Sequence, residues 1–197
     1  MPSFLSAAKI LFLSILAGIG LVSRPAEEIK PSASPAAIKI IFAGDLFFDR
    51  HLRLAVAQNG FDYPLLPLQE LLLSADLAVA NLESPITVYS SVSLGSVVGS
   101  PANYRFTSPP ETAAVLARYN LKVVNLGNNH ILNFGIDGLN QTTGFLDEAG
   151  VAYFGNTGQA EDPSRYLIKP IGKLIFGFVN YNQFVAGGKE AALSDIQ

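Results

Sequence analysis

Three short apolar runs of this sequence each end on side chains that suit a binding site better than a core. Such runs are typical of buried strands. They are residues 38–43 before Asp45, residues 77–80 before Glu83, and residues 123–124 before Asn128, Asn129 and His130. In an open α/β sheet the carboxyl ends of parallel strands face one crevice, so we expect these polar ends to meet there.

The segments between these runs predict helices, which makes an α/β fold the expected class. A leucine-rich pattern behind Pro64 predicts a helix over residues 65–74. Ser108, Pro109 and Glu111 form the pattern of a capping box at the start of a helix over residues 108–119. Further elements are expected as a loop at 84–103, a helix at 135–149, and strands at 151–154, 166–169 and 174–179.

Composition limits the possible partners. The chain has 197 residues, of which 49% are hydrophobic and 15% charged, enough for one real core. Its net charge of −3 comes without a basic cluster, which argues against nucleic acid as a partner. The chain has no cysteine, so disulfides and thiolate metal sites are excluded.

The N-terminus predicts export. Lys9 precedes an uncharged run over residues 10–22 that fits either a signal peptide or an uncleaved membrane anchor, and a buried helix is disfavoured. Residues 23–37 are rich in Pro, Ser and Ala, as in a tether. We therefore expect a leader at 1–22, a linker at 23–37 and a domain at 38–197, either secreted or membrane-anchored with the domain outside the cytoplasm.

The polar strand ends carry the donor types of a divalent metal site. Asp45, Glu83 and Asn129 offer oxygen atoms and His130 offers a nitrogen, a set that suits Mn, Zn, Fe or Mg. A carboxylate would hold the cation, a carboxamide would fill its shell without adding charge, and an imidazole could bind the metal or transfer a proton.

Each of these residues also has a structural interpretation that the sequence leaves open. Asp45 could cap a turn, and Asn128 with Asn129 could serve a left-handed turn. Glu83 could instead form an ion pair with a nearby arginine, Arg50 or Arg53.

Several spaced motifs resemble the bacterial capsule-synthesis CapA family. The family includes the poly-γ-glutamate synthesis proteins called PgsA or CapA, and it is similar to the calcineurin-like metallophosphoesterases. The resemblance spans about residues 38–179. It is carried by Gly44-Asp45 with Arg50, by Asn81-Leu82-Glu83-Ser84-Pro85-Ile86-Thr87, by Phe106 ahead of Pro109-Pro110, and by Asn128-Asn129-His130 followed by Gly135 and Gly138-Leu139.

The resemblance implies a layered α-β-β-α metallophosphoesterase-like sandwich with a metal site at the strand ends. By motif position, Asp45, Glu83 and Asn129 would be metal ligands and His130 the catalytic general acid. Arg50 and Asn128, which belong to the same motifs, are assigned to substrate binding. Two positions depart from the family pattern: Phe47 stands where a metal-binding histidine would be, and Asn133 where the family usually has aspartate. The latter departure is interpreted as concerning loop structure.

The resulting hypothesis is a CapA-like protein that acts in the synthesis or export of a capsule or of poly-γ-glutamate. If it is an enzyme, it is a metal-dependent, phosphoesterase-like hydrolase acting on a phosphoester or an anionic polymer. The alternative is a non-catalytic subunit that binds polymer or organises a membrane synthase complex. The resemblance ends near Val179, so we expect only the N-terminal part of the sandwich. For the 197-residue product without its leader we expect weak metal binding, no phosphoesterase activity, and either melting without cooperativity or self-association.

Overall fold

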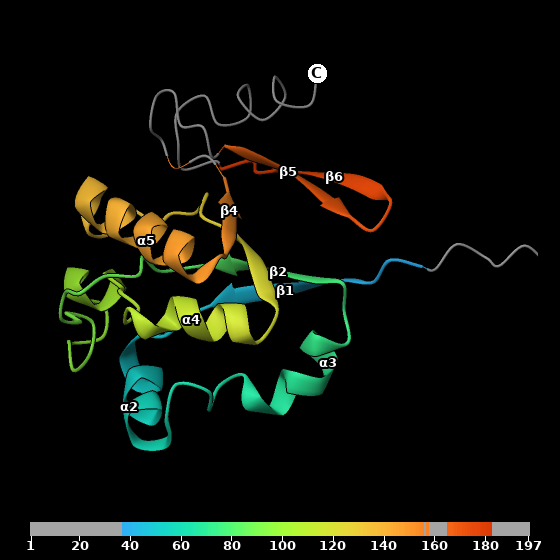
Figure 1. The fold of residues 1–197 in the computed structure, drawn as a ribbon. Coiled ribbons are helices and arrows are strands. Elements are labelled where there is room, and N and C mark those ends of the chain that lie inside the picture. Colours follow the sequence, from blue (N-terminus) through green and yellow to red (C-terminus); the bar gives the residue numbers. More distant parts are fainter. Residues whose placement is uncertain (1–36, 156, 158–164, 183–197) are drawn as a thin grey trace, which may run out of the picture. The chain divides into compact units, whose positions relative to one another are not determined.

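The computed structural model describes residues 37–155, 157 and 165–182, which form an α/β fold (Figure 1). The predicted leader at 1–22, and all of the predicted linker except Ala37, lie outside the described residues. Within the described ranges, no helix is both long and apolar enough to span a membrane.

The predicted apolar runs form the strands of a parallel four-stranded sheet. Its strands are β1 (Ile40–Leu46), β2 (Leu77–Leu82), β3 (Leu121–Asn125) and β4 (Ala152–Phe154), and they lie in the order β1-β2-β3-β4. The register places Asp45 opposite Asn81 and Asn81 opposite Asn125. Three polar side chains from three strands are thereby aligned across the carboxyl end of the sheet.

The connecting helices cover one face of this sheet. They are α2 (Arg50–Asn59), α3 (Gln69–Leu73), α4 (Glu111–Arg118) and α5 (Gly135–Ala149), with short 3₁₀ turns at η1 (Leu66–Leu68) and η2 (Pro101–Tyr104). Each crossover advances by one strand in the same direction. Such crossovers are right-handed, so connections that all move across the sheet in the same direction place their helices on the same face of the sheet.

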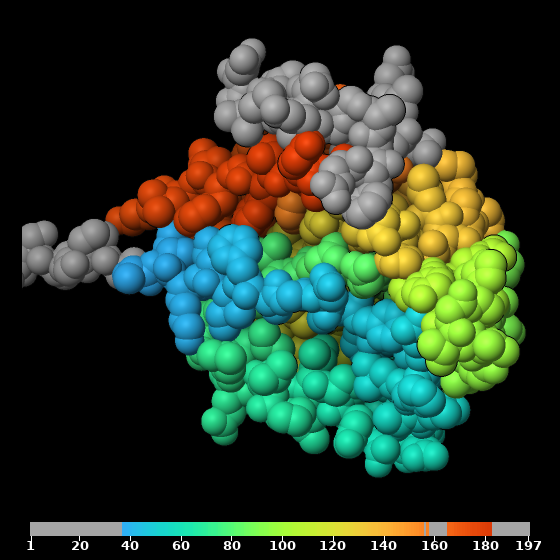
Figure 2. Space-filling view, turned by 180° about the vertical axis from the view of Figure 1, so that it is seen from behind, coloured from blue at the N-terminus to red at the C-terminus, as the bar shows by residue number. Residues whose placement is uncertain are grey.

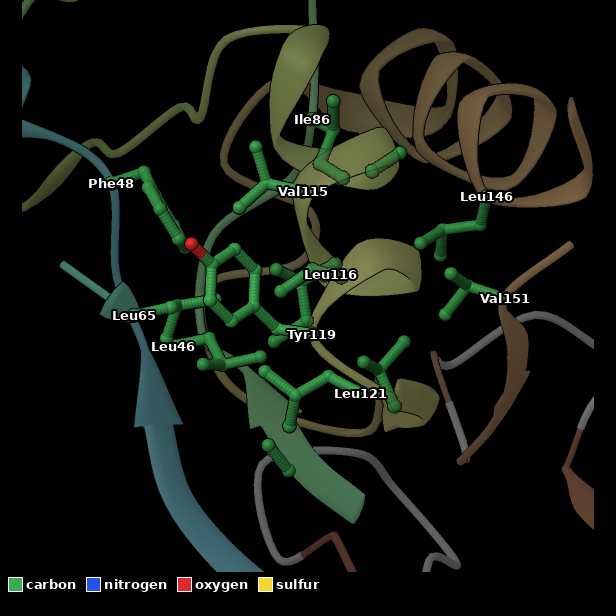
Figure 3. Packing of buried hydrophobic residues seen from close by; sticks show 14 of the residues in the cluster. Leu46, Phe48, Leu65, Ile86, Val115, Leu116, Tyr119, Leu121, Leu146 and Val151 are labelled. Atoms are coloured by element: carbon green, nitrogen blue, oxygen red, sulfur yellow. The ribbon is translucent and has the colours of Figure 1, made fainter. Parts of the chain in front are cut away.

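The helix-covered face holds the larger core (Figure 3). Leu116 of α4 and Leu146 of α5 are fully buried there and pack with Leu121 of β3. Each buried side chain of this size contributes roughly 1.5–3 kcal/mol relative to an exposed position. This core fixes the helices on the strands and so holds the strand ends in place.

A β-hairpin covers the opposite face of the sheet. Its antiparallel strands are β5 (Tyr166–Ile171) and β6 (Leu174–Val179). Phe178 packs on Val123 and Phe154 in a second core, whereas Ile168 and Ile175 on the outer side are 58% and 75% exposed. Helices, sheet and hairpin give three layers of the expected sandwich, and an outer helical layer does not occur within the described ranges.

The strand β1 lies at the open edge of the sheet. It pairs only with β2 among the described strands, and Phe42 on it is 70% exposed. Figure 2 shows this segment, in blue, at the molecular surface between the hairpin and the α2–α3 region.

The predicted capping box is wrong. The helix α4 begins at Glu111, and its N-cap residue Pro110 makes no side-chain hydrogen bond to the helix. The Ser108 hydroxyl instead lies 2.7 Å from the hydroxyl of Ser84, where both are buried. Ser108 thus contacts a side chain that is distant in the sequence and does not cap the helix that follows it. The predicted helix at 65–74 is likewise divided into η1 and α3.

Candidate functional site

A polar cavity of about 410 Å³ opens at the carboxyl ends of the strands. It contains the predicted metal-binding carboxylates and most of the predicted asparagines. Its lining is Asp45, Asn81, Glu83, Asn125, Gly127, Asn128, Asn129, Tyr181 and Asn182. A separate, mainly apolar cavity of about 290 Å³ lies between β1 and α3 and reaches the site only at Asp45.

The side chain of Asn81 joins the two carboxylates. Its Nδ2 donates to Asp45 Oδ1 at 2.8 Å and to Glu83 Oε2 at 2.6 Å. The strand register makes this possible, because Asp45 and Asn81 are direct neighbours on β1 and β2 and Glu83 follows β2. Two acidic side chains thus share one neutral donor at the floor of the cavity.

The orientation of the Asn81 amide is fixed by Asn128. Asn128 Oδ1 accepts hydrogen bonds from the backbone N–H groups of His130 and Ile131, both at 2.9 Å. The Asn128 Nδ2 must therefore be the atom that donates to Asn81 Oδ1 at 3.1 Å and to the Leu82 carbonyl at 2.8 Å. Asn81 is left with its nitrogen facing the carboxylates.

Asn128 therefore closes the turn that carries His130 through its side chain, but the left-handed turn expected as its structural alternative is wrong, because neither Asn128 nor Asn129 has a positive φ. Its amide lines the cavity, but both of its polar atoms are already engaged within the protein. Its assignment to substrate binding stays a prediction.

Burial and like charge raise the pKa of Glu83. Loss of solvent around the carboxylate is the larger cause, and the neighbouring charge of Asp45 adds to it. His130 and the hydrogen bond from Asn81 act in the opposite direction and do not cancel the rise in this pKa. A cation bound between the two carboxylates would relieve their repulsion.

Glu83 does not form the arginine ion pair that was its structural alternative. Arg53 lies 3.2 Å from Asp49 instead. Arg50 donates to the backbone carbonyl of Asn103 and to its Oδ1, the latter at 3.1 Å. The Glu83 carboxylate consequently remains directed to Asn81 and His130.

His130 lies beside the acidic pair and is held on three sides. Its Nε2 is 3.6 Å from Glu83 Oε1, and its Nδ1 is 3.1 Å from Asn133 Oδ1. Its ring packs against Phe106 with centroids 4.4 Å apart. Only 16% of the side chain is exposed, so the imidazole is positioned to act on a group bound next to Glu83.

The other two predicted site residues differ in placement. Asn129 is exposed and lines the cavity. Arg50 does not line it: its guanidinium lies over the Phe106 ring, 4.6 Å from the centroid. Phe106 contacts both Arg50 and His130, which links the predicted substrate-binding arginine to the cavity indirectly.

Five residues that line the cavity were not assigned from the sequence, and Gly127, which contributes backbone alone, is one of them. Asn81 and Asn125 belong to the strands themselves, and Tyr181 with Asn182 follows β6. The neighbouring Asn180 donates to the Gly127 carbonyl at 3.1 Å and ties this strand end to the site. The signal was present, because β6 is also an apolar run that ends on polar residues.

The donor set fits a hard divalent cation. Asp45 and Glu83 supply two close carboxylates, Asn129 a carboxamide oxygen and His130 a nitrogen. The described residues hold no ready cluster of three or more His, Asp or Glu side chains, so a cation here would also need carboxamide or water oxygens.

Comparison with known proteins identifies relatives of this chain. The capsule biosynthesis protein CapA of Bacillus anthracis is 22% identical over 151 residues, which cover 76% of this chain and 36% of that protein. The PGA biosynthesis protein CapA of Bacillus subtilis (strain 168) is 23% identical over 152 residues, covering 75% and 38%. The uncharacterized protein y4sH of Sinorhizobium fredii is 28% identical over 116 residues, covering 59% and 24%. The chain thus spans less than half the length of these relatives.

A family model gives the same result over a longer stretch. The model described as bacterial capsule synthesis protein PGA_cap matches residues 39–195. This match includes all four strands of the parallel sheet and every residue that lines the polar cavity. The chain belongs to the bacterial capsule synthesis protein family.

Proposed function

We propose that this chain acts in the synthesis or export of capsule or of poly-γ-glutamate, outside the cytoplasm, through a metal site of the metallophosphoesterase type. The observation that carries the proposal is the pair of carboxylates, Asp45 and Glu83, held together by Asn81 in a polar cavity. The names of the two Bacillus relatives supply the biological setting.

In this proposal Asp45, Glu83 and Asn129 hold a divalent cation. When bound, the cation polarises a phosphoryl or acyl oxygen and activates water. His130 carries a proton to or from a group beside Glu83, which its distance of 3.6 Å from that carboxylate makes geometrically reasonable. Asn81 and Asn128 keep these groups aligned through the hydrogen bonds between the strand ends.

The substrate in this proposal is a phosphoester or an anionic polymer. Among the described residues, the lining of the cavity contains two carboxylates and no Lys or Arg. An anionic chain would therefore approach only with a cation in place, which makes the metal part of recognition as well as of chemistry.

A second candidate is a non-catalytic subunit that binds polymer or organises a membrane synthase complex. It is favoured by the lack, within the described ranges, of a cluster of three acidic or imidazole ligands. In this case the same cavity would bind the polymer through carboxamides and a weakly held cation.

Calorimetric titration with Mn²⁺ or Zn²⁺ tests the metal site. We expect Asp45→Ala, Glu83→Ala and Asn129→Ala each to weaken binding at least about tenfold, because each removes a ligand. The matched control is Glu148→Ala, an exposed residue of α5 that does not line the cavity. Unchanged affinity in all three variants would exclude the site.

Turnover separates the enzyme from the binding subunit. With metal bound, His130→Ala should reduce hydrolysis of a generic phosphodiester by about 10²–10⁴-fold and leave metal affinity within a small factor. If metal-loaded wild type shows no turnover at all, the binding subunit is the better assignment.

A further inference from the structure

We infer that Asn133 is a positioning residue for His130: it keeps a proton on Nδ1 and so makes Nε2 the ring nitrogen that serves the cavity. Two contacts of Asn133 carry this inference. Its Oδ1 lies 3.1 Å from His130 Nδ1, and the same oxygen accepts the backbone N–H of Phe106 at 2.8 Å.

The Phe106 contact settles which atom of the Asn133 amide faces the imidazole. A backbone N–H can only donate, so the atom 2.8 Å from Phe106 N must be the amide oxygen. That oxygen has no proton to offer to the ring. The 3.1 Å contact is therefore a hydrogen bond only if His130 Nδ1 carries the proton.

The remaining contacts hold the ring and the turn that carries it. The Phe106 ring packs against the imidazole with an interplanar angle of 41°. The Asn133 backbone N–H donates to the His130 carbonyl at 2.9 Å, which closes the turn between the two residues. Arg105 Nε donates to the Asn133 carbonyl at 2.9 Å and anchors the turn from the far side.

With Nδ1 occupied, Nε2 is the nitrogen that faces Glu83. It lies 3.6 Å from Glu83 Oε1, which is farther than a hydrogen bond but close enough for one cation to contact both atoms. In an uncharged imidazole only one nitrogen carries a proton, so Asn133 and Glu83 compete for it. The shorter contact belongs to Asn133.

The placement of the proton depends only on the contacts of Asn133, whereas its use in catalysis rests on the proposed function. This distinction matters because an Nε2 lone pair facing the cavity can bind a metal or take a proton. A ring with its proton on Nε2 could do neither without first losing it.

Nitrogen-15 NMR of the imidazole rings tests the inference without requiring activity. The sequence contains two histidines, and the exposed His51 serves as the reference, assigned with a His51→Gln variant. At a pH well above the ordinary histidine pKa of about 6.5, wild-type His130 should show a protonated, pyrrole-type Nδ1 and an unprotonated, pyridine-type Nε2.

Variants at position 133 show whether Asn133 causes this state. Asn133→Ala should shift His130 toward the tautomer with the proton on Nε2, because Glu83 then becomes its nearest acceptor. Asn133→Asp keeps an acceptor at the same place and should retain the wild-type signals. The matched control is Leu132→Ala, which truncates an exposed side chain of the same turn and should leave both signals unchanged.

Two results would overturn the inference. One is a pyridine-type Nδ1 signal for His130 in the wild-type protein, a result that does not depend on whether any variant folds. The other is an Asn133→Ala protein that is folded by circular dichroism and has wild-type His130 signals. Loss of metal binding with correct His130 signals would refute the proposed function and leave the role of Asn133 standing.

Discussion

At the scale of single residues, orientation in the site is passed from one amide to the next. Two backbone N–H groups fix Asn128, Asn128 fixes Asn81, and Asn81 presents its nitrogen to Asp45 and Glu83. A second such relay, from the backbone of Phe106 through Asn133, fixes His130. Carboxamides are suited to this task because one side chain both accepts and donates.

Asp45, Glu83, His130 and the amide of Asn128 were assigned to the site from the sequence, whereas the orienting amides of Asn81 and Asn133 were not. Asp45, Glu83 and His130 follow apolar runs, and that position is visible without a structure. The part played by Asn81 depends on the register of three strands, which brings residues 36 and 47 positions apart into hydrogen-bond contact. The departure from the family pattern at Asn133 was interpreted as concerning loop structure, and the partner Phe106, 27 positions away, could not be identified from the sequence.

Asp49 is predicted to be essential for stability. Its buried carboxylate accepts from the backbone N–H groups of Arg50 and Thr107, each at 2.8 Å, and from the Ser93 hydroxyl at 3.0 Å. Asp49→Ala should lower the free energy of unfolding by about 2–4 kcal/mol, because it leaves buried donors unpaired and removes the N-cap of α2. Urea denaturation measures this change.

The control for Asp49 is an aspartate with an exposed partner. Asp62 pairs with Arg118 at 2.7 Å, and both side chains are about half exposed. Asp62→Ala should change the free energy of unfolding by less than about 1 kcal/mol. Equal effects of the two substitutions would show that the hydrogen bonds of Asp49 do not stabilise the fold.

At the scale of helices and strands, the sequence predicted the strands better than the turns that join them to the site. Apolar runs predicted the four parallel strands and the hairpin strands. Burial on both faces explains such runs in the central strands β2 and β3. The predicted start of α4 was wrong because the Ser108 hydroxyl contacts Ser84, 24 positions away, and does not cap the helix. Local capping rules cannot include a contact of that kind.

The end of β4 is predicted to tolerate no side chain. Gly155 lies at φ +124°, and an added Cβ would come within 2.4 Å of Gly127 N and 2.5 Å of Asn125 Oδ1. Gly155→Ala should therefore lower the free energy of unfolding by about 1–3 kcal/mol. It should also weaken metal binding, since Asn125 and Gly127 line the cavity.

Gly144 provides the matched control for this substitution. It lies within α5, is exposed, and has no heavy atom within 4 Å of an added Cβ. Gly144→Ala should raise the free energy of unfolding by up to about 1 kcal/mol, because alanine favours the helix. Denaturation curves that show the same change for both variants would contradict the close approach at Gly155.

At the scale of the whole molecule, exposed apolar side chains occur on two strand surfaces of the part of the chain that the structure describes. One is the edge of β1, where Phe42 is 70% exposed, and the other is the outer side of the hairpin, where Ile175 is 75% exposed. An open strand edge with apolar side chains is a template for pairing with another chain. These surfaces give a structural basis for the self-association expected from the sequence.

Sedimentation velocity over a concentration series tests this expectation. Wild-type protein should form larger species as its concentration rises, and Phe42→Lys should reduce them, because a charge on an edge strand opposes pairing. The control is Val88→Lys, which changes an equally exposed residue outside the strands. A wild-type protein that stays monomeric throughout would show that neither surface drives association.

The order of the strands also bears on how the chain acquires its structure during synthesis. In the sheet order β1-β2-β3-β4, each strand pairs with the one made just before it. None of the described strands has to insert between two that are already paired, and the β5–β6 hairpin forms from neighbouring segments. Each unit can therefore dock on the growing edge as it leaves the ribosome, a vectorial route that keeps loop-closure costs small at every step.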